Sequence, residues 1–570
     1  MSHEPLRARI HESAVKRVTR TYAATLAEIF TELLQNARRA GAVGIRIAIE
    51  RAVADDPADE TQFTVTVADD GSGITDPALL LCFGENGWPG ELVRREDAAG
   101  FGFASLARRA AAVSSRATGG ETGWRVVLAP AHFLGEADAE VLVDDAAPFP
   151  HGTSISFPAT EALTAIRNAA ENAARHFPLP VIFEDHTEDR SGAGDVLPRR
   201  AFLDGAVHAE AWRGLAFGVF RDRGYNDPDL NFHGLTLPVR LPAVETVNGP
   251  TWTVRADVQD CPELELVLPA RKEAVETGFL KEMRAAARLA IYRALAADPD
   301  PRPAYQDWTR AREAGIAIAP PPAMLRPWRP CVADAEYWRD LPKPIPASAD
   351  ALVMASDPEP PEAQALWRAA ERNGIASRLF EADRRLEGYP WYDAIERVVH
   401  IHTEATVEGR PYALDTYPVP ARTGAPEAPL PRRPDAIRIS LTVQSGKGVG
   451  RVIDLDTDLA FAGEAYVSDA LPLVTAGSAL EPHELADLMR AGFFSFSDDA
   501  DADSWETQRD RFDEEALHIA SRLLLSDDEA CRASIAEAVR RELMWLAPRD
   551  RAIDIRIRRP DVTVTLAEPA

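Results

Sequence analysis

The sequence predicts an α+β protein that begins with a mixed β-sheet covered on one face by helices, an α/β sandwich. Two patterns in the N-terminal third carry this prediction. Apolar residues recur at i, i+3 and i+4 through residues 11–40, which is typical of a helix packed on a core. Apolar and polar residues then alternate over residues 45–50 and 63–67, which is typical of half-buried strands.

The remaining elements of this N-terminal part follow in order. Gly41 supplies a natural end for the first helix, and the second strand runs directly into Asp69. Residues 102–112 are helix-like, and three further strand patterns complete the predicted sheet. These strands are expected at residues 124–128, 139–143 and 153–157.

Two more α/β regions are predicted further along the chain. In the first, strands precede a long amphipathic helix, and in the second, strands alternate with helices. The first has strands at 215–219, 235–239, 251–258 and 263–268, and its helix at 276–296. The second has strands at 351–355, 397–402, 436–443 and 552–557, and helices after Asp357 and over 504–526 and 528–546.

Proline-rich stretches between residues 298 and 346 separate these two regions. We therefore expect four segments: an N-terminal α/β sandwich, a middle α/β domain, a proline-rich linker, and one or two C-terminal α/β domains of unknown role. Their expected bounds are 1–165, 166–300, 301–347 and 348–570.

Composition narrows the classes of function. The 570 residues carry a formal net charge of −27, which repels nucleic acid and anionic membranes at long range, although a local basic groove stays possible. The four cysteines lack the spacing of a disulfide framework or a zinc site. No apolar run approaches the ~20 residues that span a bilayer, and the N-terminus has no hydrophobic signal core. We therefore expect a cytoplasmic protein with no membrane partner.

Four short motifs in a fixed order carry the chemistry. Each is weak alone, but their order and the helix and strand patterns around them argue against coincidence, and together they describe a nucleotide pocket. The motifs are Glu32-Leu-Leu-Gln-Asn36-Ala37, Asp69-Asp70-Gly71-Ser72-Gly73-Ile74, Gly100-Phe-Gly102-Phe-Ala-Ser105 and His151-Gly152-Thr153.

The first motif places Glu32 and Asn36 four residues apart on the predicted helix, so both side chains project from nearly the same side. A carboxylate there can accept a proton from an attacking water. An amide oxygen can help to hold Mg²⁺, which keeps several waters and binds mainly through phosphates. Considered alone, an exposed polar face of a helix would explain the pair equally well.

The next two motifs suit a base and phosphates. Asp69 ends a buried strand, where its carboxylate can accept a hydrogen bond from a base amino group while Gly71 and Gly73 let the backbone approach a flat ring. Gly100 and Gly102 precede a predicted helix whose free N–H groups favour phosphate. Taken singly, the Asp69 motif would also be explained by an acidic β-turn, and the motif of Gly100 and Gly102 by an ordinary glycine-rich turn.

The four motifs together resemble those of the GHKL ATPases, which adopt the Bergerat fold. This superfamily contains DNA gyrase B subunits, ninety-kilodalton heat-shock chaperones, sensor histidine kinases and MutL mismatch-repair proteins. The resemblance covers about residues 10–160 and implies their α/β sandwich. The glycine pair that ends in Gly-Phe-Ala-Ser is closer in pattern to the chaperones than to the kinases.

The resemblance also implies roles for the matched residues. Glu32 resembles the general base for ATP hydrolysis, and Asn36 resembles the magnesium ligand. Asp69 resembles the aspartate that binds adenine, with Gly73 lining the base site. Thr153 resembles the hydroxyl that supports the adenine contact. The implied cofactors are ATP and Mg²⁺, and the implied reaction is hydrolysis to ADP and phosphate.

The third motif resembles the phosphate lid, with Gly100 and Gly102 as its glycines, but it departs from the family pattern. Chaperone-like members often carry a further glycine three residues earlier, where this chain has Asp97. Residues 79–99 also lack an obvious lysine for phosphate. Arg94 or Arg95 would substitute for it, although a solvated charge pair explains these arginines as well.

The middle domain resembles the transducer that follows the ATPase in the chaperone, gyrase and MutL branches. There a lysine or similar cation is inserted toward the γ-phosphate, and Leu268-Pro-Ala-Arg271-Lys272-Glu273 resembles that loop. Lys272 is therefore the candidate sensor that stabilises charge on the transferred group and links domain closure to nucleotide state. An exposed basic turn is the alternative.

These features leave several functions open. The first is a chaperone-like ATPase that works as an ATP-gated clamp on a protein client, with homodimerisation as a possible state. The second is a DNA-transaction ATPase of the MutL or topoisomerase type, which the negative charge disfavours. A histidine kinase comes third, because no phosphoacceptor-histidine helix precedes Glu32. A nucleotide-responsive scaffold without turnover also stays open.

Overall fold

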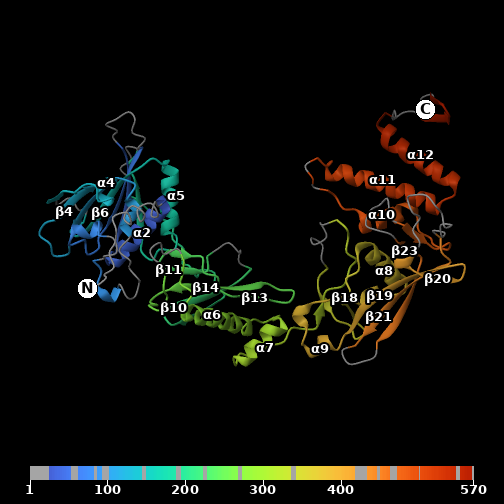
Figure 1. Ribbon diagram of the computed structural model, residues 1–570, viewed down its shortest axis with the longest axis horizontal. Coiled ribbons are helices and arrows are strands. Elements are labelled where there is room, and N and C mark those ends of the chain that lie inside the picture. Colours follow the sequence, from blue (N-terminus) through green and yellow to red (C-terminus); the bar gives the residue numbers. More distant parts are fainter. Residues whose placement is uncertain are drawn as a thin grey trace, which may run out of the picture. The chain divides into compact units, whose positions relative to one another are not determined.

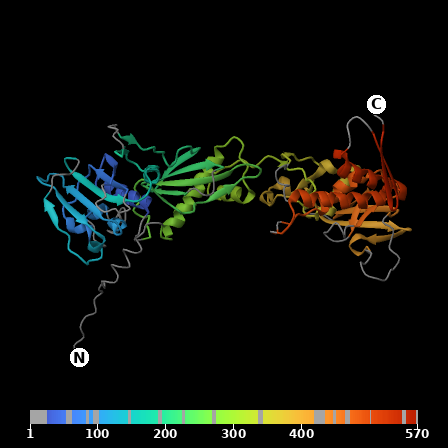
Figure 2. The same ribbon diagram turned by 90° about the horizontal axis from the view of Figure 1, so that it is seen from above.

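The computed structural model divides the chain into two compact units, Met1–Pro320 and Pro321–Ala570 (Figures 1 and 2). Among the helices of the part of the chain that it describes, none is long and apolar enough to cross a membrane. The structure describes residues 25–52, 62–82, 87–92, 102–143, 149–187, 194–222, 228–267, 273–334, 342–417, 433–445, 450–462, 471–497, 499, 501–546 and 552–567.

The first unit begins with an eight-stranded mixed sheet in the order β5-β4-β3-β6-β2-β1-β7-β8. Neighbouring strands are antiparallel, except that β1 and β7 are parallel. The strands are β1 (Ile45–Arg51), β2 (Phe63–Asp69), β3 (Ala111–Arg116), β4 (Trp124–Leu128), β5 (Val141–Val143), β6 (Gly152–Ala159), β7 (Val181–Asp185) and β8 (Asp195–Val196).

Helices α2 (Leu26–Arg39) and α5 (Leu163–Ala174) pack on this sheet and share its hydrophobic core (Figure 1). A capping box starts α2, because the Glu28 carboxylate accepts from the Thr25 N–H at 2.7 Å while Thr25 Oγ1 accepts from the Glu28 N–H. The apolar stripe of α2 is fully buried, as its period predicts. Smaller helical turns are η1 (Pro77–Leu80), η2 (Gly102–Leu106) and α4 (Pro130–Phe133).

Two features of this layer differ from expectation. Only η2 within residues 102–112 is helical, and the following residues form β3, which lies between β4 and β6. The segment Ala111–Arg116 contains few strong strand formers, so its conformation is decided by pairing on both edges. The sheet also continues past residue 165, because β7 pairs with β1; the expected domain boundary therefore falls inside this layer.

A second sheet follows in the same unit, in the order β12-β11-β14-β10-β9, with β13 paired to β14. Helix α6 (Gly278–Ala296) packs on it and shares its core. Helix α7 (Tyr305–Glu313) lies in the segment expected to be a linker, yet its Ala311 is fully buried in that core. The strands are β9 (His208–Trp212), β10 (Leu215–Arg221), β11 (Leu230–Phe232), β12 (Leu235–Leu237), β13 (Ala243–Glu245) and β14 (Thr251–Val258).

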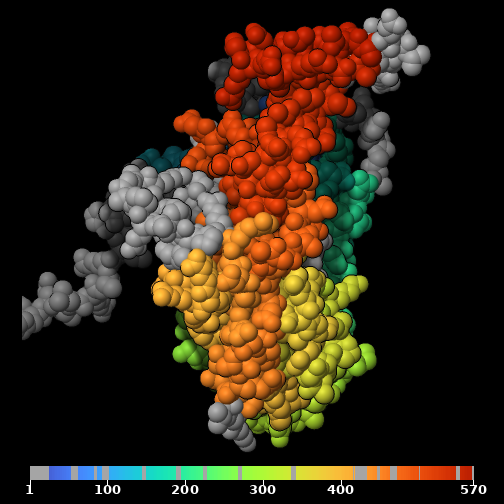
Figure 3. Space-filling model, turned by 90° about the vertical axis from the view of Figure 1, so that its right-hand side faces the viewer, coloured from blue at the N-terminus to red at the C-terminus, as the bar shows by residue number. Residues whose placement is uncertain are grey.

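The second unit has a sheet in the order β18-β17-β19-β21-β22, with β20 paired to β19. In the space-filling view, the orange residues of this unit adjoin its red C-terminal residues (Figure 3). The sheet strands are β17 (Leu352–Met354), β18 (Leu379–Glu381), β19 (Glu396–Val407), β20 (Arg410–Ala413), β21 (Ala436–Gln444) and β22 (Arg451–Thr457). The helices are α8 (Pro360–Arg372), α9 (Pro390–Asp393), α10 (Pro482–Phe493), α11 (Trp505–Leu524) and α12 (Asp527–Leu543). Two-stranded pairs are β15 (Met324–Leu325) with β16 (Ile345–Pro346), β23 (Leu459–Ala462) with β24 (Leu471–Val474), and β25 (Ile553–Arg558) with β26 (Asp561–Leu566).

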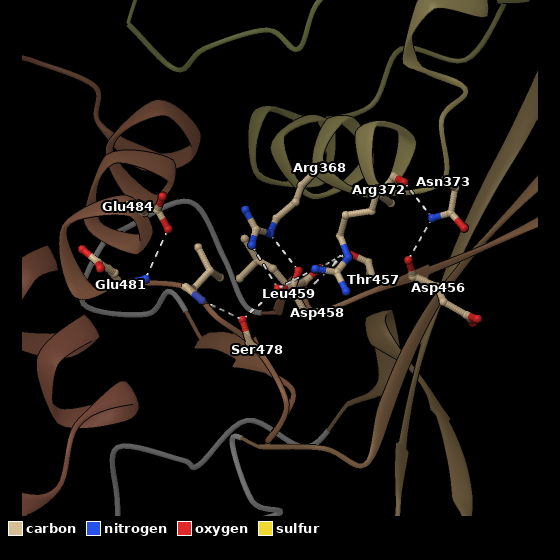
Figure 4. A network of polar contacts seen from close by, with 12 residues as sticks. Arg368, Arg372, Asn373, Asp456, Thr457, Asp458, Leu459, Ser478, Glu481 and Glu484 are labelled. Carbon is tan, nitrogen blue, oxygen red and sulfur yellow. Dashed lines mark hydrogen bonds and ion pairs between the residues drawn. The ribbon is translucent and has the colours of Figure 1, made fainter.

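A buried ion cluster fastens α8 to the turn between β22 and β23 (Figure 4). The Asp458 side chain is 2% exposed and accepts from Arg368 at 2.7 and 2.9 Å, and from Arg372 at 3.2 Å. Ser478 adds a hydroxyl donor at 2.8 Å. Burial opposes ionisation of Asp458, but the hydrogen bonds from Arg368 and Ser478 outweigh it and hold the pKa below its ordinary value. Every charge of this cluster is satisfied internally, so we assign it a structural role.

Candidate functional site

One face of α2 carries three polar side chains, Glu32, Asn36 and Arg39, at positions i, i+4 and i+7. The Glu32 side chain is 24% exposed and its carboxylate lies against the backbone of Gly102, where a Cβ atom would overlap Glu32 Oε1. The first and third sequence motifs therefore meet at the start of η2. Glycine at position 102 is what lets the carboxylate come so close.

Arg39 joins the two polar residues expected on this helix. Its Nη1 donates to Asn36 Oδ1 at 3.0 Å and lies 3.8 Å from Glu32 Oε1. Only 2% of the Arg39 side chain is exposed. Helical side chains tilt toward the N-terminus, which brings the guanidinium back along α2 to residues one and two turns earlier. Arg39 is not among the residues predicted from the sequence, although its i+7 spacing from Glu32 places it on the same face of the helix.

The second motif forms a turn at the end of β2. Asp69 is the last residue of β2 and pairs in register with Thr153 of β6. Its Oδ1 accepts from the Gly71 N–H at 2.9 Å. Burial raises the pKa of Asp69 to about 6, and it does so despite the backbone hydrogen bonds from Gly71 and Thr153, which favour the charged form. A partly buried carboxylate with so high a pKa is a candidate for a functional position.

Both glycines of this turn are required by its own packing. Gly73 has φ +70°, and a Cβ there would overlap the carbonyl oxygen of Arg116 at the end of β3. A Cβ at Gly71 would lie 2.6 Å from the Cβ of Ala40, just after α2. The turn thus sits tightly between α2 and β3, as only residues without side chains allow.

A buried hydroxyl pair fixes the fourth motif to this turn. Ser115 Oγ donates to the Gly152 carbonyl at 2.9 Å, accepts from the Ile74 N–H at 2.8 Å and lies 3.0 Å from Thr153 Oγ1. His151 Nδ1 lies 2.8 Å from the Gly71 carbonyl oxygen. The strands β3 and β6 therefore hold Thr153 beside Asp69. Ser115 is a second residue that the sequence motifs did not reveal, because β3 was not predicted.

Helix α2 and the Asp69 turn are directly connected. The Ser72 N–H donates to the Ala40 carbonyl at 2.8 Å, and Asp70 Oδ1 accepts from the N–H groups of Val43 and Gly44 at 2.8 and 2.9 Å. Asn36 lies one turn before Ala40, and Glu32 two turns before it. The site therefore runs along α2, from the Asp69 turn at one end to Gly102 and Glu32 at the other.

Several expected site residues lie outside the described residues. Gly100 of the lid motif and the candidate sensor Lys272 are among them, as are Asp97, Arg94 and Arg95. Their roles stay predictions.

Comparison with known proteins decides the family. Residues 21–130 match the sequence profile of the histidine kinase-, DNA gyrase B-, and HSP90-like ATPases. Residues 21–130 belong to a GHKL ATPase domain. Among solved structures, the chain is similar to the Aquifex aeolicus MutL ATPase domain complexed with ADP, at 12% sequence identity and a TM-score of 0.25; the match covers 46% of this chain and 97% of that chain. Comparison with curated proteins found no match.

The predicted α/β sandwich is confirmed for this GHKL ATPase domain, and proteins of this family bind ATP. The described residues fit an adenine nucleotide. Asp69 offers a partly buried acceptor at one end of α2. At the other end, the hydroxyl of Ser105 in η2 is buried and has no hydrogen-bond partner within the described residues, which leaves its donor available to a ligand oxygen.

The fit to a divalent cation is poorer. Asn36 Oδ1, the oxygen expected to help hold Mg²⁺, already accepts from the Arg39 guanidinium. A cation there would have to share this oxygen with a fixed positive charge. No group of three or more His, Cys, Asp or Glu side chains in the described part of the chain is arranged to hold a metal ion.

The GHKL ATPase domain is also tied to the second sheet of its unit. Gln35 lies between the two site residues of α2, is 3% exposed, and donates through Nε2 to the His233 carbonyl at 2.6 Å. His233 and Gly234 form the turn between β11 and β12, and both have positive φ, of 53° and 102°. A Cβ at Gly234 would lie 2.9 Å from the Cα of Phe177. This turn is therefore wedged against the ATPase layer at two points.

Proposed function

We propose that the N-terminal domain binds ATP and hydrolyses it to ADP and phosphate, and that the second sheet of the first unit responds to the bound nucleotide. The observation that carries the proposal is that a partly buried carboxylate suited to a base and a candidate general base lie at opposite ends of α2. Asp69 lies at one end of this helix and Glu32 at the other.

At the base end, Asp69 in its ionised form accepts a hydrogen bond from the exocyclic amino group of adenine. Thr153, which Ser115 holds in place, supports this contact through its hydroxyl. The turn around Gly71 and Gly73 lets the ring approach the backbone. Because Asp69 is partly buried, the carboxylate forms this hydrogen bond in an environment of lowered dielectric constant, where hydrogen bonds are stronger than in water.

At the phosphate end, Glu32 orients a water molecule and accepts its proton as that water attacks the terminal phosphorus. Gly102 leaves room for the carboxylate, and Ser105 offers a hydroxyl donor. When bound, Mg²⁺ would neutralise phosphate charge, but Asn36, the residue expected to hold it, already accepts from Arg39 through Oδ1. Gly100 in the lid and Lys272 in the middle domain are proposed to complete the phosphate contacts.

We further propose that the protein is a chaperone-like clamp acting on a protein client in the cytoplasm. The Gln35 hydrogen bond to His233 supports a mechanical link, because any movement of α2 on nucleotide binding is passed directly to the β11–β12 turn. A net charge of −27 favours a protein client over nucleic acid. Homodimerisation would allow closure around the client. DNA-stimulated, salt-sensitive turnover would instead favour a MutL-type role.

The test compares the full chain with Asp69→Ala and Glu32→Gln by calorimetric titration of ADP and by phosphate release from ATP. Asp69→Ala is expected to abolish measurable binding. Glu32→Gln is expected to bind normally and to lose about 10²-fold or more of turnover, which is the usual contribution of a positioned general base. Glu161→Gln, which removes a carboxylate paired with Arg109 outside the site, is the matched control and is expected to change neither.

The outcomes separate the candidate functions. Binding without turnover in the unmodified chain would indicate a nucleotide-responsive scaffold. No binding of adenine nucleotide by the unmodified chain would refute the proposal as a whole.

A further inference from the structure

The position of Arg39 sets this nucleotide site apart from one built around a divalent cation. The guanidinium is almost completely buried, with 2% of the side chain exposed. Its Nη1 donates to Asn36 Oδ1 at 3.0 Å and lies 3.8 Å from Glu32 Oε1. The Glu32 carboxylate in turn lies against the backbone of Gly102. These contacts place a permanent positive charge at the phosphate end of the site.

A guanidinium is well suited to this place. It carries a delocalised charge and five N–H donors in a planar fork that matches the geometry of phosphate oxygens. It is more weakly hydrated than an ammonium group, so its burial is tolerated better. Mg²⁺, by contrast, demands near-octahedral geometry and gives up its waters reluctantly. Two positive centres that share the single Asn36 oxygen also repel each other, and the covalently attached one cannot leave.

We propose that Arg39 supplies positive charge to the nucleotide phosphates itself, so that the nucleotide binds with little dependence on a divalent cation. The inference rests on the proposed nucleotide site and deepens it. Asn36 then serves to orient the guanidinium through Oδ1, and Glu32 is held by the same cation in the place from which it meets water.

Arg38 provides a matched control on the same helix. It is the preceding residue, it has the same charge in the last turn of α2, and its Nη2 lies 3.4 Å from Gln35 Oε1. Both arginines carry a positive charge near the C-terminus of α2, where they interact with the helix dipole about equally favourably. A difference between variants at the two positions therefore reports the position of the guanidinium and not the loss of helix stabilisation.

The experiment measures the Kd of the non-hydrolysable ATP analogue AMPPNP by calorimetry in excess MgCl₂ and in excess EDTA. For the unmodified chain, the two Kd values are expected to agree within about threefold, well under the tenfold that 1.4 kcal/mol represents. For Arg39→Gln, the Kd in EDTA is expected to rise by about tenfold or more, as loss of a charge-assisted contact predicts. MgCl₂ is expected to restore part of the affinity of Arg39→Gln. In EDTA, the Kd of Arg39→Lys is expected to lie between those of the unmodified chain and Arg39→Gln.

Each outcome bears on the inference. Arg38→Gln should behave like the unmodified chain, because its guanidinium lies outside the proposed phosphate contacts. If the unmodified chain loses tenfold or more affinity in EDTA, the inference is overturned, whatever the variants do and whether or not Arg39→Gln folds. Equal metal dependence in Arg39→Gln and in the unmodified chain overturns it too. If no protein binds AMPPNP in either buffer, the nucleotide site itself is refuted, a failure distinct from the other two.

Discussion

Lowering the pH from about 8 to about 5 is expected to weaken adenine-nucleotide binding through Asp69. The ionised carboxylate accepts a stronger, charge-assisted hydrogen bond from the amino group of adenine, whereas protonation turns one of its oxygens into an O–H donor that opposes this amino group. Burial raises the pKa of Asp69 to about 6, so the group gains its proton within a pH range in which an exposed aspartate stays charged. The affinity therefore falls as the pH drops through 6.

The magnitude follows from the fraction of Asp69 that is ionised. With a pKa of about 6, nearly all of it is charged at pH 8 and about half at pH 6. At pH 5 only about one-tenth is charged, so the observed affinity should be about tenfold lower than at pH 8, or about 1.4 kcal/mol. Binding near pH 6 should also release protons, because the bound base favours the charged form.

Calorimetric titration of ADP across this pH range measures the loss of affinity directly. It measures the release of protons through the dependence of the binding enthalpy on the ionisation enthalpy of the buffer. Because the phosphates of the ligand also titrate, the matched control is Asp69→Asn, whose amide oxygen accepts a hydrogen bond but does not titrate. The ratio of the two affinities isolates Asp69. A ratio that stays constant from pH 5 to pH 8 would contradict the assigned role of this carboxylate.

Three further predictions concern packing and coupling. Gly73→Ala should lower the free energy of unfolding by about 1–3 kcal/mol and abolish ADP binding, because a Cβ at φ +70° would overlap the backbone of β3. The control Gly41→Ala has a similar φ of +73° but no atom within 4 Å of the added Cβ. In a thermal melt it should lose less stability than Gly73→Ala, and it should still bind ADP. Gln35→Ala should cost about 1–3 kcal/mol by removing the hydrogen bond to His233, and should reduce nucleotide-induced protection of β11 and β12 in hydrogen exchange; unchanged protection would refute the link. Asp458→Asn should destabilise the second unit by about 3 kcal/mol in denaturant unfolding and leave ADP affinity unchanged.

Local patterns were sufficient to predict most of the first layer. The 3.6-residue period predicted α2, and alternation predicted β1 and β2, because each pattern records burial on one face of a single element. The same reasoning failed for β3, whose sequence of small and polar residues has no strong strand preference. Its conformation depends on β4 and β6, which pair with it from both sides. The length of the sheet was also underestimated, because β7 joins β1 from far along the chain.

For the site, the sequence by itself determined the type of chemistry: the four motifs and the spacing of Glu32 and Asn36 on one helix face identified the nucleotide-binding family. The tertiary structure decided what these groups can do. It partly buried Asp69 and so raised its pKa, and it brought the Arg39 guanidinium into contact with Asn36. It also joined Gln35 to His233, 198 residues away. Motif spacing is local and survives in the sequence. Desolvation and charge contacts depend on which distant strands close over a residue, and those neighbours are assembled only when the chain folds.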